Sequence, residues 1–276
     1  RRALGLQEKT GNKINQSGIL MNIGLVYLHQ KKYKAAIEEY EKGMAIAREI
    51  KHLEFEIKAL VSIASIHKDY GNFPRSIEAK QKAIDIYREL GDKSKEANQL
   101  LSLSRIYENF EEYKSSISTL SAALSIIKEI EKPSRLGSVY DNIGRSLVQE
   151  GSYDSALVYL RKSVSNYKQY QKTSRLRFPL YNIGNIYQIQ GQHDSANLYI
   201  QQSYDIAIDR KDDYIQMLCL SDIGRIQAKE GRKRLALSTF DQALSLNPLQ
   251  KYPKTKMPLL EDAYEISTEL DSPNLA

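Results

Sequence analysis

The stretch Asn182-Ile-Gly-Asn-Ile-Tyr-Gln-Ile-Gln-Gly-Gln-His-Asp-Ser-Ala196 decides the fold, because the chain repeats it at a fixed interval. Related segments begin forty residues earlier, at Asn142-Ile-Gly-Arg145, and forty residues later, at Asp222-Ile-Gly-Arg225. A further copy begins at Asn22-Ile-Gly-Leu-Val-Tyr27, and weaker ones begin at Ser62 and Ser102. A constant period of this length predicts a repeat protein, in which each unit packs on its neighbours along the chain.

Each unit contains two helical patterns separated by a turn. In the first copy, Ile23, Gly24 and Tyr27 have the spacing of one helix face, and a second apolar pattern runs from Tyr33 to Ala47. The sequence therefore predicts an all-helical chain of six helix pairs, at about 15–54, 55–94, 95–134, 135–174, 175–214 and 215–254.

The two ends of the chain are expected to lie within further units of a single solenoid spanning 1–276. Residues 1–13 resemble the end of a preceding repeat, and 257–276 resemble the start of a truncated seventh. Neither end has the polar character of a solenoid cap, which suggests a fragment of a longer protein. The connection over 247–256 contains two prolines and is the expected irregularity or hinge.

Three columns of the aligned repeats hold only Gly, Ala or Ser. Helices that pack about 8–10 Å apart need small side chains where their backbones come closest. Glycine within a helix costs about 1 kcal/mol relative to alanine, so its recurrence predicts a close-packing position. A large replacement such as Ala196→Leu should cost about 1–3 kcal/mol. The columns are Gly24, Ala64, Ser104, Gly144, Gly184, Gly224; Ala36, Ser76, Ser116, Ala156, Ala196, Ala236; and Gly43, Ala83, Ala123, Ser163, Ser203, Ala243.

The turns have their own pattern. Within each pair, the first helix is expected to end at a residue in the left-handed conformation, which favours glycine. That column reads Lys31, Gly71, Glu111, Gly151, Gly191, Gly231. Between pairs, short polar segments such as 90–95, 131–134, 171–174 and 209–213 are expected to cap the next helix through Asp or Ser.

These columns resemble those of the tetratricopeptide repeat. The first-helix and turn positions of that family match Leu180, Ile183-Gly184, Tyr187 and Gly191, and its first second-helix position matches Ala196. In the sixth unit, Ala236, Phe240, Ala243 and Pro248 match its second half. The departures are a period of 40 where 34 is usual, and a loose fit at His67, Lys80 and Gln227. The longer unit is similar to the variant found in kinesin light chains and spindle-orientation adaptors. The resemblance implies an all-α, right-handed superhelical solenoid of antiparallel helix pairs.

The resemblance also implies a function without catalysis, namely the binding of a protein or peptide in a concave groove lined by the first helices. Arginine in such a groove is suited to forked contacts with carboxylates, which favours an acidic partner. The alternative is a solvated face on which the arginines pair with Asp141 and Glu108. The candidate contact residues are Met21, Leu25, Leu101, Arg105, Asp141, Arg145, Phe178, Tyr181, Asn185 and Arg225.

A second resemblance concerns signalling proteins. The amino-acid composition of the repeats, rich in Lys, Tyr, Ser and Ile, is similar to that of the sensor arrays of certain bacterial histidine kinases and DNA-binding regulators. This resemblance implies a sensor region whose output domain lies outside the chain. It would place the chain in the bacterial cytoplasm or in a periplasm-facing region.

The remaining features point away from other classes of function. The net charge of +6 arises from 40 basic and 34 acidic residues that are interspersed, which is typical of a solvated surface. Basic residues gather at Gly231–Arg234 and Lys251–Lys256, and a single aromatic residue, Tyr252, lies among them. Base stacking needs more aromatic residues than this, so no nucleic-acid partner is expected. No apolar run approaches the length of about 20 residues that a membrane span needs. Cys219 is the single cysteine and the four histidines are scattered, so neither a metal, a cofactor nor a catalytic site is expected.

Overall fold

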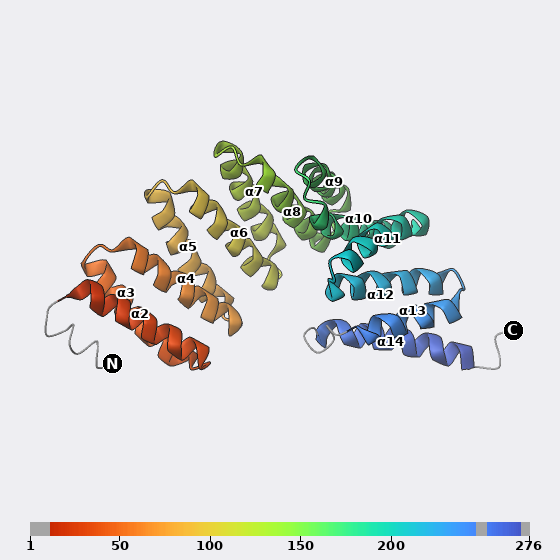
Figure 1. Ribbon diagram of the computed structural model, residues 1–276, viewed down its shortest axis with the longest axis horizontal. Helices are drawn as coiled ribbons and strands as arrows, with labels where there is room; N and C mark the ends of the chain where they lie inside the picture. The colour runs from red at the N-terminus through yellow and green to blue at the C-terminus, as the bar shows by residue number, and fades with distance from the viewer. Residues whose placement is uncertain (1–11, 247–252, 272–276) are drawn as a thin grey trace. The chain divides into compact units, whose positions relative to one another are not determined.

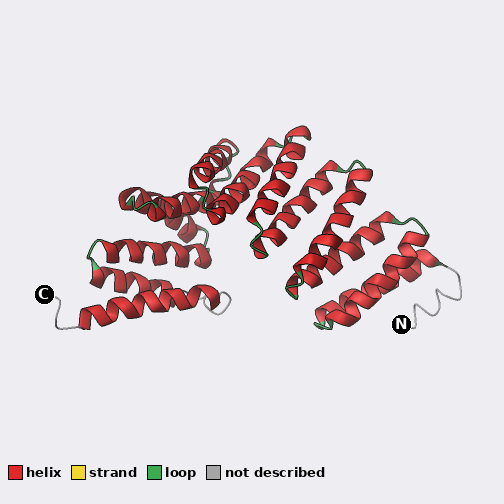
Figure 2. Cartoon of the chain, turned by 180° about the vertical axis from the view of Figure 1, so that it is seen from behind, coloured by secondary structure: helices red, strands yellow, loops and turns green. Residues whose placement is uncertain are grey.

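The computed structural model describes residues 12–246 and 253–271, and for 253–256 and 271 it describes the backbone alone. This part of the chain forms helices and connecting turns and contains no β-strand. It divides into two compact units, Arg1–Pro133 and Ser134–Ala276, which we call unit 1 and unit 2. The boundary falls at the predicted junction of the third and fourth repeats. Helices and turns of both units are shown in Figure 1 and, from behind, in Figure 2.

Unit 1 consists of helix pairs in which each helix packs antiparallel to the next (Figure 1). Its described helices have the same length and alternate as first and second members of three pairs. They are α2 (Lys13–His29), α3 (Tyr33–Glu49), α4 (Leu53–Asp69), α5 (Phe73–Glu89), α6 (Lys93–Asn109) and α7 (Tyr113–Glu129).

Unit 2 continues the pattern and includes the first helix of the predicted seventh repeat, which packs on α13. Successive first helices contact one another from α8 to α10, from α10 to α12 and from α12 to α14. The elements are η1 (Pro133–Arg135), α8 (Leu136–Glu150), α9 (Tyr153–Gln169), η2 (Thr173–Arg175), α10 (Arg177–Ile189), α11 (His193–Asp209), α12 (Asp213–Lys229), α13 (Lys233–Ser245) and α14 (Pro253–Asp271).

The turns within pairs follow the prediction. Each residue of the turn column has a positive φ, from +56° at Lys31 to +86° at Gly151. The turns between pairs repeat this left-handed geometry at Lys51, Gly91, Glu131, Gln171 and Lys211, which the sequence analysis did not predict. The backbone period is thus twenty residues, while the period of the side-chain pattern is forty.

Helix capping follows the prediction only in part. The Oδ1 atoms of Asp92 and Asp212 accept backbone N–H groups of α6 and α12, respectively. The expectation that Ser134 and Ser174 are caps is wrong, because both lie in 3₁₀ turns that precede α8 and α10. The carbonyl of Ser134 instead accepts a hydrogen bond from Lys172 Nζ at 2.7 Å. Most of the proline-containing connection, at 247–252, lies outside the described residues.

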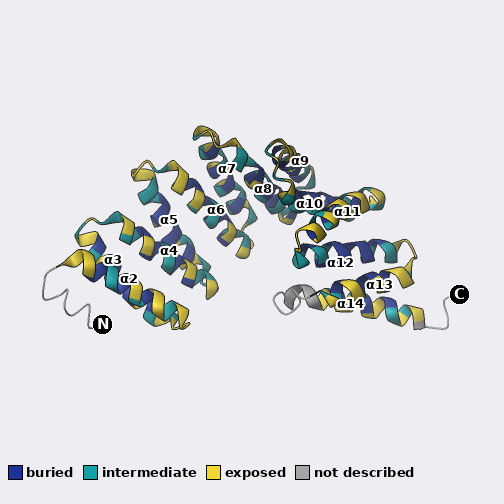
Figure 3. Ribbon diagram, in the orientation of Figure 1, coloured by how far each residue is buried: buried dark blue, intermediate teal, exposed yellow. Residues whose placement is uncertain are grey.

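The residues of the small columns are buried in every repeat, as predicted for close-packing positions. Figure 3 shows that every labelled helix carries buried positions. The alanine and serine members of the small columns are fully buried, as are the apolar residues that they face. A Cβ atom at Gly184 would lie 2.6 Å from Cγ1 of Ile200 and 3.1 Å from the carbonyl oxygen of Ala196. The backbone of α10 therefore approaches α11 at a distance that only glycine permits without a shift of the neighbouring atoms.

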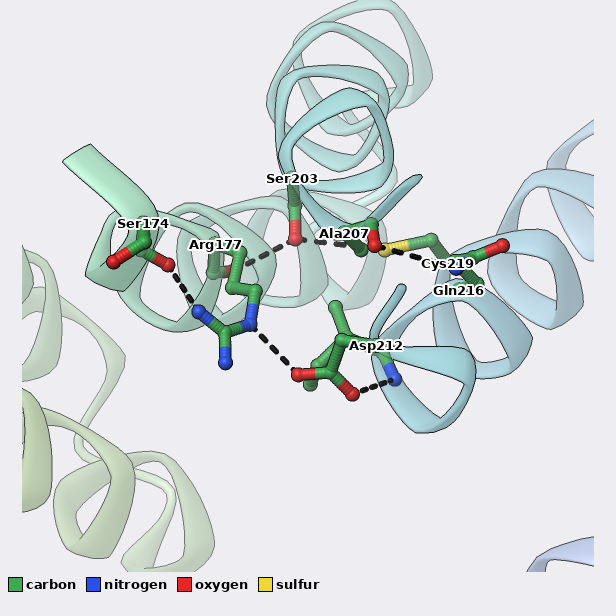
Figure 4. Close-up of polar contacts among 8 residues, drawn as sticks. Ser174, Arg177, Ser203, Ala207, Asp212, Gln216 and Cys219 are labelled. Atoms are coloured by element: carbon green, nitrogen blue, oxygen red, sulfur yellow. Dashed lines mark hydrogen bonds and ion pairs between the residues drawn. The ribbon is translucent and has the colours of Figure 1, made fainter. Parts of the chain in front are cut away.

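Serine in a small column adds a hydrogen bond to this packing, as Figure 4 shows for α10, α11 and α12. Ser203 Oγ donates to the carbonyl of Arg177 at 2.7 Å and lies 3.5 Å from Cys219 Sγ. Arg177 Nε donates to Asp212 Oδ2 at 2.7 Å, which ties the start of α10 to the N-cap of α12. The buried hydroxyl of Ser203 and the half-buried guanidinium of Arg177 are thus paired where three helices meet, which limits the cost of removing them from water.

Candidate binding face

The first-helix face of each unit holds the ten residues predicted to contact a partner, and their exposure differs widely. The sequence predicts that Met21 contacts a partner. In the structure its side chain is 0% exposed and belongs to the core of unit 1, so it is closed to a partner. Asp141, at 7% exposure, is also buried. Leu25 is 39% exposed, and Arg105 is exposed as well. The others are half-buried: Leu101, Arg145, Phe178, Tyr181, Asn185 and Arg225.

In unit 2, two of the half-buried residues take part in a polar chain that crosses three first helices. Tyr181 on α10 donates its hydroxyl to Asp222 Oδ2 on α12 at 2.9 Å. Arg225 binds the other oxygen of Asp222 through Nη1 at 2.9 Å. Its Nε donates to Asp262 Oδ2 on α14 at 2.7 Å. We call these four residues, Tyr181, Asp222, Arg225 and Asp262, the acidic ladder.

Burial governs the electrostatics of the acidic ladder. Asp222 is 3% exposed, and removal from water raises the pKa of its carboxyl although Arg225 opposes the rise. Burial, and then the Asp222 carboxylate, raise the pKa of the Tyr181 hydroxyl well above its ordinary value. Tyr181 and Arg225 are therefore engaged in joining helices. The predicted alternative placed the arginines against Asp141 and Glu108, whereas Arg225 pairs with Asp222 and Asp262.

Sequence reasoning missed the acidic members of this ladder. Asp222 and Asp262 stand forty residues apart in one column, which Asn182 also occupies. Asn182 Nδ2 lies 3.5 Å from Asp141 Oδ1 on α8, so the column contacts the preceding first helix at this step too. The pairing of Arg225 with these aspartates could have been predicted from the sequence, because the repeat places their column beside the column that contains Arg225.

Phe178, the predicted aromatic anchor, is covered by a neighbouring cation. The guanidinium carbon of Arg177 lies 4.2 Å from the centroid of the Phe178 ring. The same arginine is held by Asp212, which fixes it over the ring. The ring also packs, partly buried, against the apolar residues of α11 and α12. Its role in unit 2 is thus shared between core packing and a cation–π contact.

Unit 1 differs at two cations, Arg105 on its first-helix face and Lys80 on the second helix α5, which have no acidic partner among the described residues. No hydrogen bond or ion pair joins Arg105 to another residue in the described part of the chain. Lys80 on α5 is 5% exposed, and its Nζ donates to Gln99 Oε1 on α6 at 3.1 Å. Burial, and to a smaller extent the charges of Lys68 and Arg105, lower the pKa of Lys80 to about 8. A buried cation here faces an amide oxygen where a carboxylate would be usual.

Both Lys80 and Gln99 occupy columns that are otherwise apolar. The Lys80 column holds core residues that are at most 1% exposed, and the Gln99 column holds Ala59, Val139 and Cys219 at 0%. Lys80 on α5 and Gln99 on α6 are therefore two polar residues at apolar positions of the second and third repeats, and they bind each other. The other residues of the Lys80 column are Tyr40, Leu120, Leu160, Ile200 and Phe240.

The described residues include no group of three or more His, Cys, Asp or Glu side chains placed to hold a metal ion. Cys219 is fully buried, and burial raises the pKa of its thiol to about 12. A thiol with such a pKa is protonated at neutral pH and is a poor nucleophile. No helix in the described ranges is long and apolar enough to span a membrane.

Comparison with known families identifies the repeats. The tetratricopeptide repeat matches residues 15–89 in one form and residues 137–170 and 179–207 in another. A model of anaphase-promoting complex subunit 5 matches residues 95–139. No curated protein sequence matches the chain. Together with the antiparallel pairs and small columns, these matches define an all-α helical-repeat protein.

The chain belongs to the tetratricopeptide-repeat family. Solved structures share this fold at low sequence identity. A STAND protein with a tetratricopeptide repeat sensor from Pyrococcus horikoshii is similar with a TM-score of 0.73 and 16% identity, over 92% of this chain and 39% of that one. Aspartyl phosphate phosphatase F from Bacillus subtilis gives a TM-score of 0.63 at 14% identity, over 96% and 74%. A Rap protein complexed with competence and sporulation factor gives 0.54 at 14%, over 94% and 76%.

Proposed function

We propose that the chain is a non-catalytic scaffold that binds a peptide or a segment of a partner protein along its first-helix face. The observation that carries the proposal is the contrast between columns. The packing columns are buried in every repeat, whereas the column that begins with Leu25 and includes Arg105 changes from repeat to repeat and is exposed in unit 1. An exposed position that is free of packing duties can be adapted to one partner.

Unit 1 supports this proposal better than unit 2. The guanidinium donors of Arg105 are available to a partner. Two apolar side chains accompany it on this face: Leu25 on α2 occupies the same column as Arg105, and Leu101 on α6 occupies the column of Met21. In the acidic ladder, by contrast, Arg225 is already bound by two carboxylates. A partner segment that uses guanidinium contacts would therefore meet Arg105 before it could compete for Arg225.

The test is a selection of binding peptides from a displayed random library on the full chain, followed by affinity measurements on two variants. Arg105→Ala removes the available guanidinium, and Lys114→Ala removes an exposed cation from the second helix α7. We expect Arg105→Ala to weaken the selected peptides at least tenfold and Lys114→Ala to leave them unchanged. Equal affinities for wild type and Arg105→Ala would refute this assignment of the face.

A second candidate function is suggested by the Pyrococcus neighbour, whose sensor region is also a tetratricopeptide array. In this candidate the chain is the sensor of a bacterial signalling protein, a histidine kinase or a transcriptional regulator, with its output domain elsewhere. The sequence that flanks these residues in the gene distinguishes the two. A kinase or DNA-binding pattern there would favour the sensor, and its absence would favour a free-standing scaffold.

A further inference from the structure

The Lys80 ammonium has more hydrogen-bond donors than the protein fills. An ammonium group carries three N–H donors. Gln99 accepts one of them, and no other acceptor contacts Lys80 within the described residues. An ionised group in a dry environment is costly unless its donors are met. Two donors are thus left for an acceptor that the described chain does not supply.

The surroundings of Lys80 show what kind of acceptor would be favoured. Lys68 on α4 and Arg105 on α6 both lie close enough to act on the charge of Lys80. Lys68 is paired only with Asp69, its neighbour in sequence, at 3.2 Å. Glu108, one turn after Arg105, is engaged in an interaction of its own. Cations from three helices therefore act on the charge of Lys80, and no carboxylate is paired with it among the described residues.

We propose that Lys80, Lys68 and Arg105 form a binding site for an oxyanion, a carboxylate or a phosphate group carried by the partner segment. The proposal rests on the proposed function for the origin of that group. Lys68 and Arg105, whose side chains reach solvent, attract the anion, and Lys80 donates to it from within the helix layer. Each of these cations gains an opposite charge when the anion binds, and Lys80 gains most because it is the most buried.

The experiment follows the Lys80 side chain of the full chain by NMR after labelling with ¹³C-lysine. Lys80 is assigned by its absence in Lys80→Leu, a variant that restores the leucine found at Leu120 and Leu160 and should therefore fold. The pKa of Lys80 is measured in chloride, in acetate and in inorganic phosphate at one ionic strength. An oxyanion that binds stabilises the charged ammonium, so it should raise the pKa from about 8 towards its ordinary value of 10.5.

The matched control is Lys82, which lies on the same helix, is 54% exposed and is paired with Glu78. A rise at Lys80 alone supports the site, and the anion that causes the larger rise identifies the carboxylate or the phosphate as the preferred group. An unchanged pKa in both anions, or an equal rise at Lys82, would overturn the proposal.

The peptides selected for the proposed function separate the two hypotheses. If Arg105→Ala weakens a peptide and Lys80→Leu does not, the scaffold function stands and the oxyanion site is overturned. If Lys80 responds to an anion but no peptide is selected, the site stands and the scaffold function loses its support. We expect Lys80→Leu to weaken an acidic peptide at least tenfold.

Discussion

Unit 1 and unit 2 use the same packing columns but differ in how particular charged groups on or against their first helices are paired. In unit 2, the acidic ladder joins α10, α12 and α14, and each of its charged groups has a partner of opposite sign. In unit 1, Lys80 meets Gln99 only, and Arg105 has no ion pair in the described part of the chain. The comparison teaches that the repeat specifies where helices touch, whereas the residues between the packing columns decide whether a face is closed by internal contacts or left for a partner.

The acidic ladder can be broken at its centre. Asp222→Ala leaves the Tyr181 hydroxyl and the Arg225 guanidinium without their shared acceptor in a buried place. Removing one partner of a buried ion pair typically costs about 3–5 kcal/mol, so we expect the free energy of unfolding to fall by about 3 kcal/mol. Urea unfolding followed by circular dichroism measures the change, and hydrogen exchange should place it in unit 2.

The control is Asp262→Ala at the outer end of the same ladder. The side chain of Asp262 is 29% exposed, and its ion pair among the described residues is with Arg225, so its loss should cost about 1 kcal/mol or less. Equal losses for the two variants would show that the ladder is a set of surface pairs and that unit 2 is no more closed than unit 1.

The second prediction compares two glycines of the same column. Gly184→Ala in unit 2 would place Cβ 2.6 Å from a branch of Ile200 and 3.1 Å from its backbone nitrogen, neither of which can move freely. We expect a loss of about 2 kcal/mol from overpacking. Gly24→Ala in unit 1 would place Cβ 3.1 Å from the Tyr40 ring, which can give slightly.

For Gly24→Ala the strain is offset by the helix propensity of alanine, about 1 kcal/mol better than glycine, so the net change should be near zero. Thermal unfolding of both variants measures the difference. If the two cost the same, packing at this column is uniform and the units do not differ there.

The third prediction concerns the buried cation of unit 1. Lys80→Leu should raise the free energy of unfolding at neutral pH by about 1–2 kcal/mol, because an apolar side chain replaces a charge that lacks an acidic partner. The folded-state pKa of about 8 lies below the ordinary 10.5. Between these values the unfolded chain binds more protons, so the stability of the wild type should rise with pH through that window.

The difference in stability between wild type and Lys80→Leu should therefore shrink between pH 8 and pH 10.5. Denaturation of both proteins at several pH values measures it, and subtraction removes the titration of the other lysines and tyrosines. A constant difference across this window would mean that the charge of Lys80 is not penalised in the folded state.

The fold could be predicted from the sequence because packing acts on every repeat alike. Gly184, Ala196 and Ser203 carry one signal, which the other copies reinforce. The left-handed turns at Lys51 and Lys211 were not predicted, because a left-handed conformation is inferred from glycine and lysine rarely adopts it. Their positions are fixed by the twenty-residue helix spacing, which outweighs the local cost of positive φ.

The site could be predicted less well, because it depends on contacts between particular residues. Arg105, Arg145 and Arg225 stand in one column and look equivalent in the sequence. Whether each has an acidic partner depends on the residue that the next first helix offers, as Asp262 does for Arg225. In the sequence, Lys80 is only a loose fit to the family pattern. Its burial and the cations near it are visible only in the structure, so a binding role for it could not be predicted.

The smallest expected effect concerns the turns within pairs, where the units differ again. All three of the described turns in unit 2 have glycine at the left-handed position, whereas unit 1 has Lys31 and Glu111 there. A left-handed conformation costs a residue with a Cβ atom about 1–2 kcal/mol, and glycine loses part of this advantage through its greater freedom when unfolded. Lys31→Gly should therefore stabilise the chain by about 0.5–1 kcal/mol, and Gly191→Lys should destabilise it by a similar amount. Thermal unfolding measures both. A loss of stability in Lys31→Gly would show that the lysine side chain contributes more to this turn than its backbone strain removes, and that the turns of unit 1 are specified by side-chain contacts in place of glycine.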